Sequence, residues 1–190
     1  LRIYGAEPAG AREDECWEQT LVRLLQTMAG AEVGGAEAFF VRLAIAFKKT
    51  GVDQKVVIRR NTSRARALRA GGVEPLELPF GGRMDFRTRP ALQREIDRHR
   101  PDVILSWMSR ASWATPAARK PNTYKLIARL GGYYDLKYYR HCDYLIGNTQ
   151  DIVDHIVREG FDPARAVYLP NFVHRPTTEV VSRLGFDTPI

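Results

Sequence analysis

Cysteine and histidine are scarce in this sequence, and the few that occur stand far apart. The chain has two cysteines and four histidines. They are Cys16, Cys142, His99, His141, His155 and His174. None of these spacings matches a Cys/His zinc pattern. The sequence therefore predicts no structural metal and no metal cofactor, and the sparse cysteines favour a reducing, cytoplasmic compartment.

Long apolar runs are also absent. A membrane-spanning helix needs about 20 consecutive apolar residues, and no run here approaches that length. The first residues lack the basic and then apolar pattern of a secretory signal. With 190 residues, of which 44% are hydrophobic and 27% charged, the sequence is typical of one soluble domain with a substantial core.

Acidic residues are outnumbered by basic ones, 22 against 29, which gives a formal net charge of +7 at pH 7. Such an excess favours a polyanionic partner. Charge alone leaves three candidates, which are a phosphorylated small molecule, an anionic lipid surface and nucleic acid. The basic helix expected at 62–70 is accordingly either a solvated face or part of a binding patch.

Two familiar glycine motifs are missing. G-x-G-x-x-G would need a third glycine after Gly34 and Gly35, and no Lys-Ser/Thr pair follows as in a P-loop. An ordinary dinucleotide-dependent dehydrogenase and an NTPase are therefore disfavoured.

What the chain does contain is a strand, a glycine loop and a helix between Leu21 and Lys49. The strand is predicted at 21–25 and the helix from about Gly35 to a stop at Gly51, with Phe40 and Phe47 on one face. Glycines ahead of a helix let the backbone approach a ligand, and the free N–H groups of the first turn suit a phosphate. The alternative is that Gly34 and Gly35 only permit a tight turn.

Further strands and helices alternate along the chain. Strands are expected at 53–59, 73–78, 102–107, 124–130, 144–147 and 166–169, and helices at 62–70, from Thr88, and from Asn148 or Thr149 to Gly160. A loop is expected at 108–122 and a short tyrosine-rich helix at about 131–134. This order predicts an α/β fold, a doubly wound, mostly parallel Rossmann-like sheet of about seven strands with helices on both faces.

The expected domain organisation has three parts. Residues 1–20 form a disordered extension or an edge element, 21–173 the Rossmann-like domain, and 174–190 the start of an interdomain linker. Because ligands bind at the carboxyl ends of parallel strands, the candidate site lies in the loops that follow the first, fourth, fifth and sixth strands.

The order of segments resembles the amino-terminal half of a family-4 (group 1) retaining glycosyltransferase of the GT-B fold. The matching motifs are Gly34-Gly35-Ala36-Glu37, Pro101-Asp102-Val103-Ile104, Asp143 to Thr149 before a helix that ends at Glu159-Gly160, and Tyr168 to Val173. The resemblance covers roughly 21–173.

This resemblance implies that Gly34 and Gly35 approach the diphosphate of a nucleotide-sugar donor. Other loops of this half would bind a saccharide or glycolipid acceptor, such as lipopolysaccharide or another cell-envelope glycan. The implied acceptor-binding residues are Trp107, Arg110, Arg129, Gly131, Tyr133, Asn148 and Thr149. No catalytic acid or base is assigned, because Ser106-Trp107 and Arg129 to Gly132 stand where many relatives carry histidines.

The second, nucleotide-binding half of such enzymes has no counterpart here, so the chain alone is expected to be inactive. Relatives carry in that half a pair of glutamates eight residues apart, and the pair Glu7 and Glu15 is interpreted as a coincidence.

Two other functions stay open, namely half of a nucleotide-sugar epimerase and a non-catalytic basic binding domain. Nucleic acid is disfavoured, because aromatic and basic residues are not interleaved along one strand. The tyrosines at 133–139 pack in the core, or they offer a platform for sugar rings or an interfacial belt. An anionic membrane surface is a further expected partner, which would place the protein at the inner face of the membrane.

Overall fold

The computed structural model describes residues 22–82, 84–120 and 123–172. The expected terminal parts, 1–20 and 174–190, lie outside this range. Seven strands form one sheet in the order β3-β2-β1-β4-β5-β6-β7, and every neighbouring pair is parallel. The strands are β1 (Leu24–Met28), β2 (Gln54–Arg59), β3 (Leu76–Leu78), β4 (Val103–Trp107), β5 (Lys125–Leu130), β6 (Tyr144–Gly147) and β7 (Ala166–Tyr168). The predicted fold class is confirmed.

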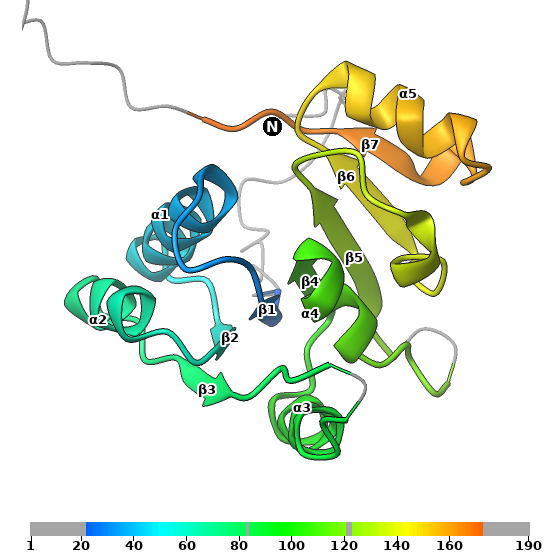
Figure 1. Ribbon diagram of the computed structural model, residues 1–190. Coiled ribbons are helices and arrows are strands. Elements are labelled where there is room, and N and C mark those ends of the chain that lie inside the picture. Colours follow the sequence, from blue (N-terminus) through cyan, green and yellow to red (C-terminus); the bar gives the residue numbers. More distant parts are fainter. Residues whose placement is uncertain (1–21, 83, 121–122, 173–190) are drawn as a thin grey trace, which may run out of the picture.

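Helices cover both faces of the sheet (Figure 1). They are α1 (Gly35–Lys49), α2 (Thr62–Ala70), α3 (Thr88–His99), α4 (Met108–Ala114) and α5 (Gln150–Arg158), with the 3₁₀ turns η1 (Leu136–Tyr138) and η2 (Pro163–Arg165). The connections from β1 to β3 run outward in one direction, and those from β4 to β7 run in the other. Right-handed crossovers then put α1 and α2 on one face and α3, α4 and α5 on the opposite face.

Two hydrophobic clusters fill the spaces between the sheet and its helices. Under α1 and α2, Phe40 and Leu68 pack against Met28 and Trp107. On the other face, residues of α3, α4 and α5 pack against Leu25, Ile104 and Leu126 among others. Successive residues of a strand point to opposite faces of the sheet and so belong to opposite clusters. All five residues of β1 are therefore buried.

The expected strand at 21–25 was placed too early, because β1 continues to Met28. Gln26 and Thr27 look like turn residues in the sequence but are fully buried. The amide of Gln26 donates to Gln54 Oε1 at 3.0 Å, and the hydroxyls of Thr27 and Thr115 lie 3.0 Å apart. A polar side chain whose hydrogen bonds are made can occupy a central strand.

The loop expected at 108–122 is also wrong in part, because α4 occupies its first seven residues. Met108 has φ +69°, in the left-handed region that residues with a Cβ seldom adopt. This sharp turn starts the helix directly after Trp107. The expected tyrosine-rich helix lies later, as η1, and Thr88 is the first residue of α3 and not its cap.

We expect Ile104→Ala to lower the free energy of unfolding by about 2–5 kcal/mol, because it empties space at a fully buried position of β4. Urea unfolding followed by circular dichroism measures this change. The control is Val33→Ala, at a position that is 84% exposed, where the expected change is within about 0.5 kcal/mol. Equal losses in both variants would contradict the assignment of Ile104 to the core.

Candidate functional site

A hollow of about 340 Å³ lies at the carboxyl edge of the sheet, between β1 and β4, where the order in which strands are added to the sheet reverses. In open parallel sheets this reversal point is where ligands bind. The hollow is lined by Gly35, Ala36, Glu37, Phe39, Trp107, Met108, Arg129, Gly131, Tyr134, Asn148 and Asn171. Residues of the first turns of α1 and from the ends of β4, β5 and β6 thus meet at one place, as the sequence predicted for the loop ends of this edge.

The amino terminus of α1 forms one wall of the hollow. Its N-cap is Gly34, which has no side chain to cap the first turn. The first N–H groups of a helix have no partner inside the helix, and together with the helix dipole they favour an anion. Gly35 lines the hollow directly, and a Cβ added there would meet nothing within 4 Å.

Glu37 and Arg64 hold the glycine loop in shape. The buried carboxylate of Glu37 accepts a hydrogen bond from the Ala31 N–H at 2.8 Å. The buried guanidinium of Arg64 donates to the carbonyl oxygen of the same residue. Burial lowers the pKa of Arg64, while the charge of Glu37 raises it. Because Glu37 bonds to the loop, it does not cap its own helix.

Arg129, at the end of β5, is a buried cation inside the hollow. Its guanidinium carbon lies 5.0 Å from the ring centre of Phe39 and 5.5 Å from that of Trp107, and its Nη2 donates to Asn171 Oδ1 at 2.6 Å. Burial lowers the pKa of this guanidinium. Among the described residues no carboxylate pairs with it. Aromatic faces and one amide compensate a buried charge only in part, so the position favours an anionic ligand.

The candidate residues of the sequence analysis fall into three groups. Gly35, Trp107, Arg129, Gly131 and Asn148 line the hollow. Asn148 Oδ1 is buried and accepts no hydrogen bond from the described residues. The indole of Trp107 is buried too, and its Nε1 donates to Gln26 Oε1 at 3.2 Å, which gives it a structural role as well.

Gly34, Tyr133 and Thr149 do not line the hollow. Gly34 faces the carboxylate of Glu37. Tyr133 is 64% exposed, and its hydroxyl donates to Asp151. The hydroxyl of Thr149 caps α5 by accepting from the Ile152 N–H at 3.3 Å.

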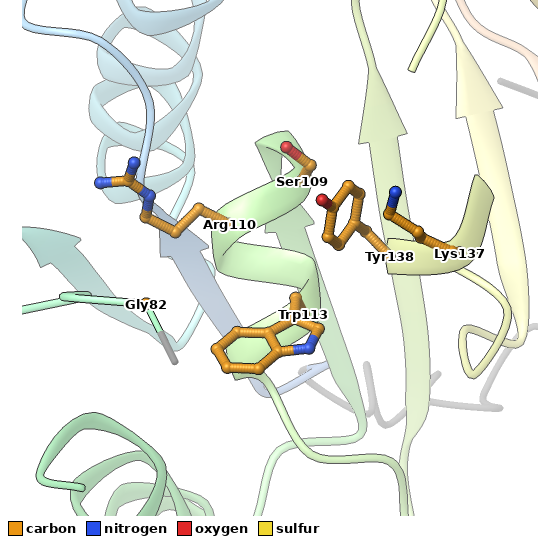
Figure 2. Close-up of a pocket in the computed structure, with 6 residues that line it drawn as sticks. All are labelled: Gly82, Ser109, Arg110, Trp113, Lys137 and Tyr138. Atoms are coloured by element: carbon orange, nitrogen blue, oxygen red, sulfur yellow. The ribbon is translucent and has the colours of Figure 1, made fainter. Parts of the chain in front are cut away.

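Arg110 lines a second hollow, of about 550 Å³, together with Ser109 and Trp113 of α4 (Figure 2). The candidate site thus consists of two adjacent hollows, of which Met108 lines the first and Ser109 the second.

Sequence reasoning missed four contributors to the first hollow, which are Ala36, Glu37, Phe39 and Asn171. Phe39 lies in a helix, where apolar residues are expected in the core, and Asn171 follows the last strand, which was not among the candidate loop ends. Met108 and Tyr134 belong to the loop ends after the fourth and fifth strands, which the sequence did place at this edge, and only the path of the backbone separates Tyr134 from Tyr133. The signal available for Glu37 was its place in the first turn of a helix that has no capping side chain.

The family model of Glycosyltransferase Family 4 matches residues 33–175. The lipopolysaccharide core biosynthesis glycosyltransferase LpsE of Rhizobium meliloti is 32% identical over 159 residues, which are 82% of this chain and 45% of LpsE. The chain therefore spans less than half the length of this curated relative.

Two solved structures show the same fold at low sequence identity. One is HepE of Anabaena in complex with UDP and glucose, with TM-score 0.62 and 14% identity, covering 79% of this chain and 44% of HepE. Another is a UDP-GlcNAc 2-epimerase of Neisseria meningitidis bound to UDP-GlcNAc, with TM-score 0.54 and 13% identity, covering 79% of this chain and 46% of the epimerase.

We expect Gly34→Ala to destabilise the protein and Gly35→Ala to leave its stability unchanged or slightly raised. A Cβ at Gly34 would collide with the Glu37 carboxylate, while one at Gly35 enters open space. Displacing the buried carboxylate from Ala31 N–H costs about 1–3 kcal/mol, whereas an alanine in an unstrained helical position gains about 0.4–1 kcal/mol. Thermal unfolding of both variants measures the difference. Equal stability of the two would show that Glu37 does not hold the loop.

Proposed function

The chain belongs to glycosyltransferase family 4, and we propose that it is the acceptor-side half of an enzyme that transfers a sugar from a nucleotide-sugar donor. The acceptor is a saccharide or glycolipid of the cell envelope. Two findings support this choice of acceptor, namely the curated relative that acts in lipopolysaccharide core biosynthesis and the basic character of the chain. The second, donor-binding half is supplied by a further domain, since the relative is about twice as long.

The observation that carries the proposal is a buried cation and an uncapped helix terminus that line one hollow. Arg129 and the first turn of α1 both favour an anion at this place. The donor of a sugar transfer carries such an anion, its diphosphate. We therefore propose that Gly35 and Arg129 bind the diphosphate. This changes the role of Arg129, which the sequence analysis assigned to the acceptor.

The chemistry follows from where charge develops. The bond between the sugar C1 and the diphosphate oxygen breaks, a bond from C1 to an acceptor hydroxyl oxygen forms, and the proton of that hydroxyl passes to the leaving diphosphate. The diphosphate leaves with increased negative charge, which fixed N–H groups and a guanidinium stabilise in a site with little water. Family membership supports retention of configuration at C1. No residue of this half is assigned as acid or base, and we propose no metal for these steps.

The acceptor is proposed to bind next to the leaving group. Asn148 Oδ1 lacks a hydrogen-bond donor within the described chain, and a buried acceptor without a partner is costly. A sugar hydroxyl would supply that donor. The backbone at Gly131 is accessible: a Cβ added there would have its nearest neighbouring atoms 3.9 Å away. A sugar can therefore approach the backbone at this position.

An epimerase on this scaffold is less well supported. Such an enzyme needs acidic and basic side chains that exchange a proton with the sugar. Within the described lining of the first hollow, Glu37 carries the one carboxylate, and it is bonded to Ala31 N–H. The likeness to the epimerases is one of fold.

The proposed membrane contact combines exposed apolar residues with basic segments of the chain. None of the helices in the described part of the chain has the length and apolar character that a membrane crossing requires. Three exposed apolar residues lie in loops after β1 and β3, namely Val33, Met84 and Phe86. The 59–69 segment has five arginines and no acid, and the charged residues of 108–129 are all basic. Apolar and basic groups together suit an anionic interface.

We expect Gly35→Val and Arg129→Gln to lower kcat/KM of the full-length enzyme by about tenfold or more. The valine side chain would block the approach of the diphosphate to the helix terminus, and the glutamine would remove a charged hydrogen bond to the diphosphate. The measurement is release of nucleoside diphosphate from a nucleotide-sugar in the presence of acceptor. Arg94→Gln, on the exposed side of α3, is the control for the loss of one charge and should retain full activity.

Circular dichroism should show that both variants fold, and this 190-residue chain alone should not turn over the donor. Normal turnover by both variants would refute the diphosphate role. Turnover by the chain alone would refute the division of the site between two domains.

We expect the chain to bind anionic vesicles more strongly than neutral ones, and the more so at low salt. Each basic residue near an anionic surface contributes about 1 kcal/mol, which screening by salt reduces. Co-sedimentation with phosphatidylglycerol and with phosphatidylcholine vesicles measures this preference, beside a variant with alanine at Arg110, Arg119 and Lys120. If both lipids bind equally, or if the triple variant binds like the parent chain, the basic segment serves solubility and the membrane proposal fails.

A further inference from the structure

The second hollow lies against α4 and is lined by three separate parts of the chain. Gly82 comes from the loop after β3, Ser109, Arg110 and Trp113 from α4, and Lys137 and Tyr138 from η1. Figure 2 shows Arg110 and Trp113 extending from α4, with Tyr138 and Lys137 on the other side of the helix from Gly82. Its volume of about 550 Å³ is within the range of about 300–1,000 Å³ that small-molecule sites occupy.

Two aromatic rings border this hollow, and each is held in place. The guanidinium carbon of Arg89 lies 5.4 Å from the ring centre of Trp113, and Arg89 Nη2 donates to the Trp113 carbonyl at 3.2 Å. Tyr138 carries Lys137 Nζ at 5.0 Å from its ring centre. Both rings also pack against the core. A fixed aromatic ring offers a flat apolar surface, which suits the C–H face of a sugar ring.

Arg110 supplies a cation that the described residues leave without an ion pair or a hydrogen bond to another side chain. It stands three residues before Trp113 on α4, so the two side chains are neighbours on one helical face. Lys137 differs, because its Nζ lies 2.5 Å from Asp135 Oδ2. Of the two cations that line this hollow, Arg110 is therefore the one available to an anion.

One acidic side chain near Arg110 is already engaged. Asp85 borders a small recess beside Arg110 and Trp113. Its oxygens accept hydrogen bonds from the N–H groups of Gly81, Arg87 and Thr88. Burial would raise the pKa of Asp85, but these bonds and that of the Thr88 hydroxyl outweigh it and hold the pKa at about 2. The carboxylate of Asp85 thus holds its own loop in place through these hydrogen bonds and does not pair with Arg110.

We propose that this hollow is an acceptor subsite for a sugar unit that bears an anionic group, with the ring against Trp113 and the anion at Arg110. The assignment rests on the proposed function. The two hollows are adjacent, since Met108 lines one and Ser109 the other, so an acceptor seated here extends toward Arg129 and Gly35. The subsite selects acceptors by charge at a distance from the hydroxyl that reacts.

The test is binding of four probes to this chain by isothermal titration calorimetry, without any donor. Glucose 6-phosphate should bind more tightly than glucose and more tightly than inorganic phosphate, because it engages both ring and cation. Glucuronate, which joins a carboxylate to a sugar ring, should likewise bind more tightly than glucose. Arg110→Gln should weaken glucose 6-phosphate by about tenfold, the size of one charged hydrogen bond, and bring it to the level of glucose. Trp113→Leu should weaken both sugars and leave inorganic phosphate unchanged.

Arg94→Gln is the matched control, as an exposed arginine on α3 away from the hollow, and should bind like the parent chain. Thermal unfolding establishes that each variant is folded. If Arg110→Gln binds glucose 6-phosphate as the parent does, or if inorganic phosphate binds as tightly as the sugar phosphate, the proposal is overturned. These results do not depend on sugar transfer, so failure of the subsite and failure of the glycosyltransferase proposal are separate outcomes.

Discussion

The parallel direction of all seven strands is the constraint on which the rest of this structure depends. In a parallel sheet every strand must end at the same edge, so residues far apart in sequence, such as Gly35, Arg129 and Asn148, are brought together there. The reversal of strand order between β1 and β4 then keeps helices from covering that edge, because the chain leaves the two strands toward opposite faces. A hollow at this place needs no special side chains to open it. The side chains determine what it binds.

Three buried charged side chains, Glu37, Arg64 and Arg129, shape the hollow, and only Arg129 favours an anion there directly. Glu37 accepts a hydrogen bond from the N–H of Ala31, and Arg64 donates one to the carbonyl oxygen of the same residue. These two bonds fix the loop and leave the amino terminus of α1 without a side-chain cap. Arg129 has no such counterpart in the described chain and lies against the faces of Phe39 and Trp107. Burying an arginine in this way costs free energy unless an anion compensates it. An anionic ligand beside Arg129 would offset this cost.

Much of the fold could be predicted from the sequence, and the exceptions have physical causes. The helix at 62–70 and the strand at 144–147 have the predicted bounds, because caps, glycines and apolar runs mark their ends. The end of β1 was misplaced, since Gln26 and Thr27 are satisfied by Gln54 and Thr115, residues that lie far along the chain. The start of α4 has no glycine to announce it, because Met108 adopts the left-handed conformation itself.

The site could be predicted as a set of loop ends but not residue by residue. Gly34 and Gly35 are adjacent in a motif that treats them alike, yet one faces Glu37 and the other faces the hollow. Thr149 and Asn148 were equal candidates to cap a helix, and the cap formed by Thr149 leaves Asn148 to line the hollow. Such alternatives are decided by which neighbour takes the local hydrogen bond, a competition set by the backbone path. Arg110 shows the limit most clearly. The short α4 carries it away from Arg129, so two cations that the sequence assigned to one acceptor site border separate hollows.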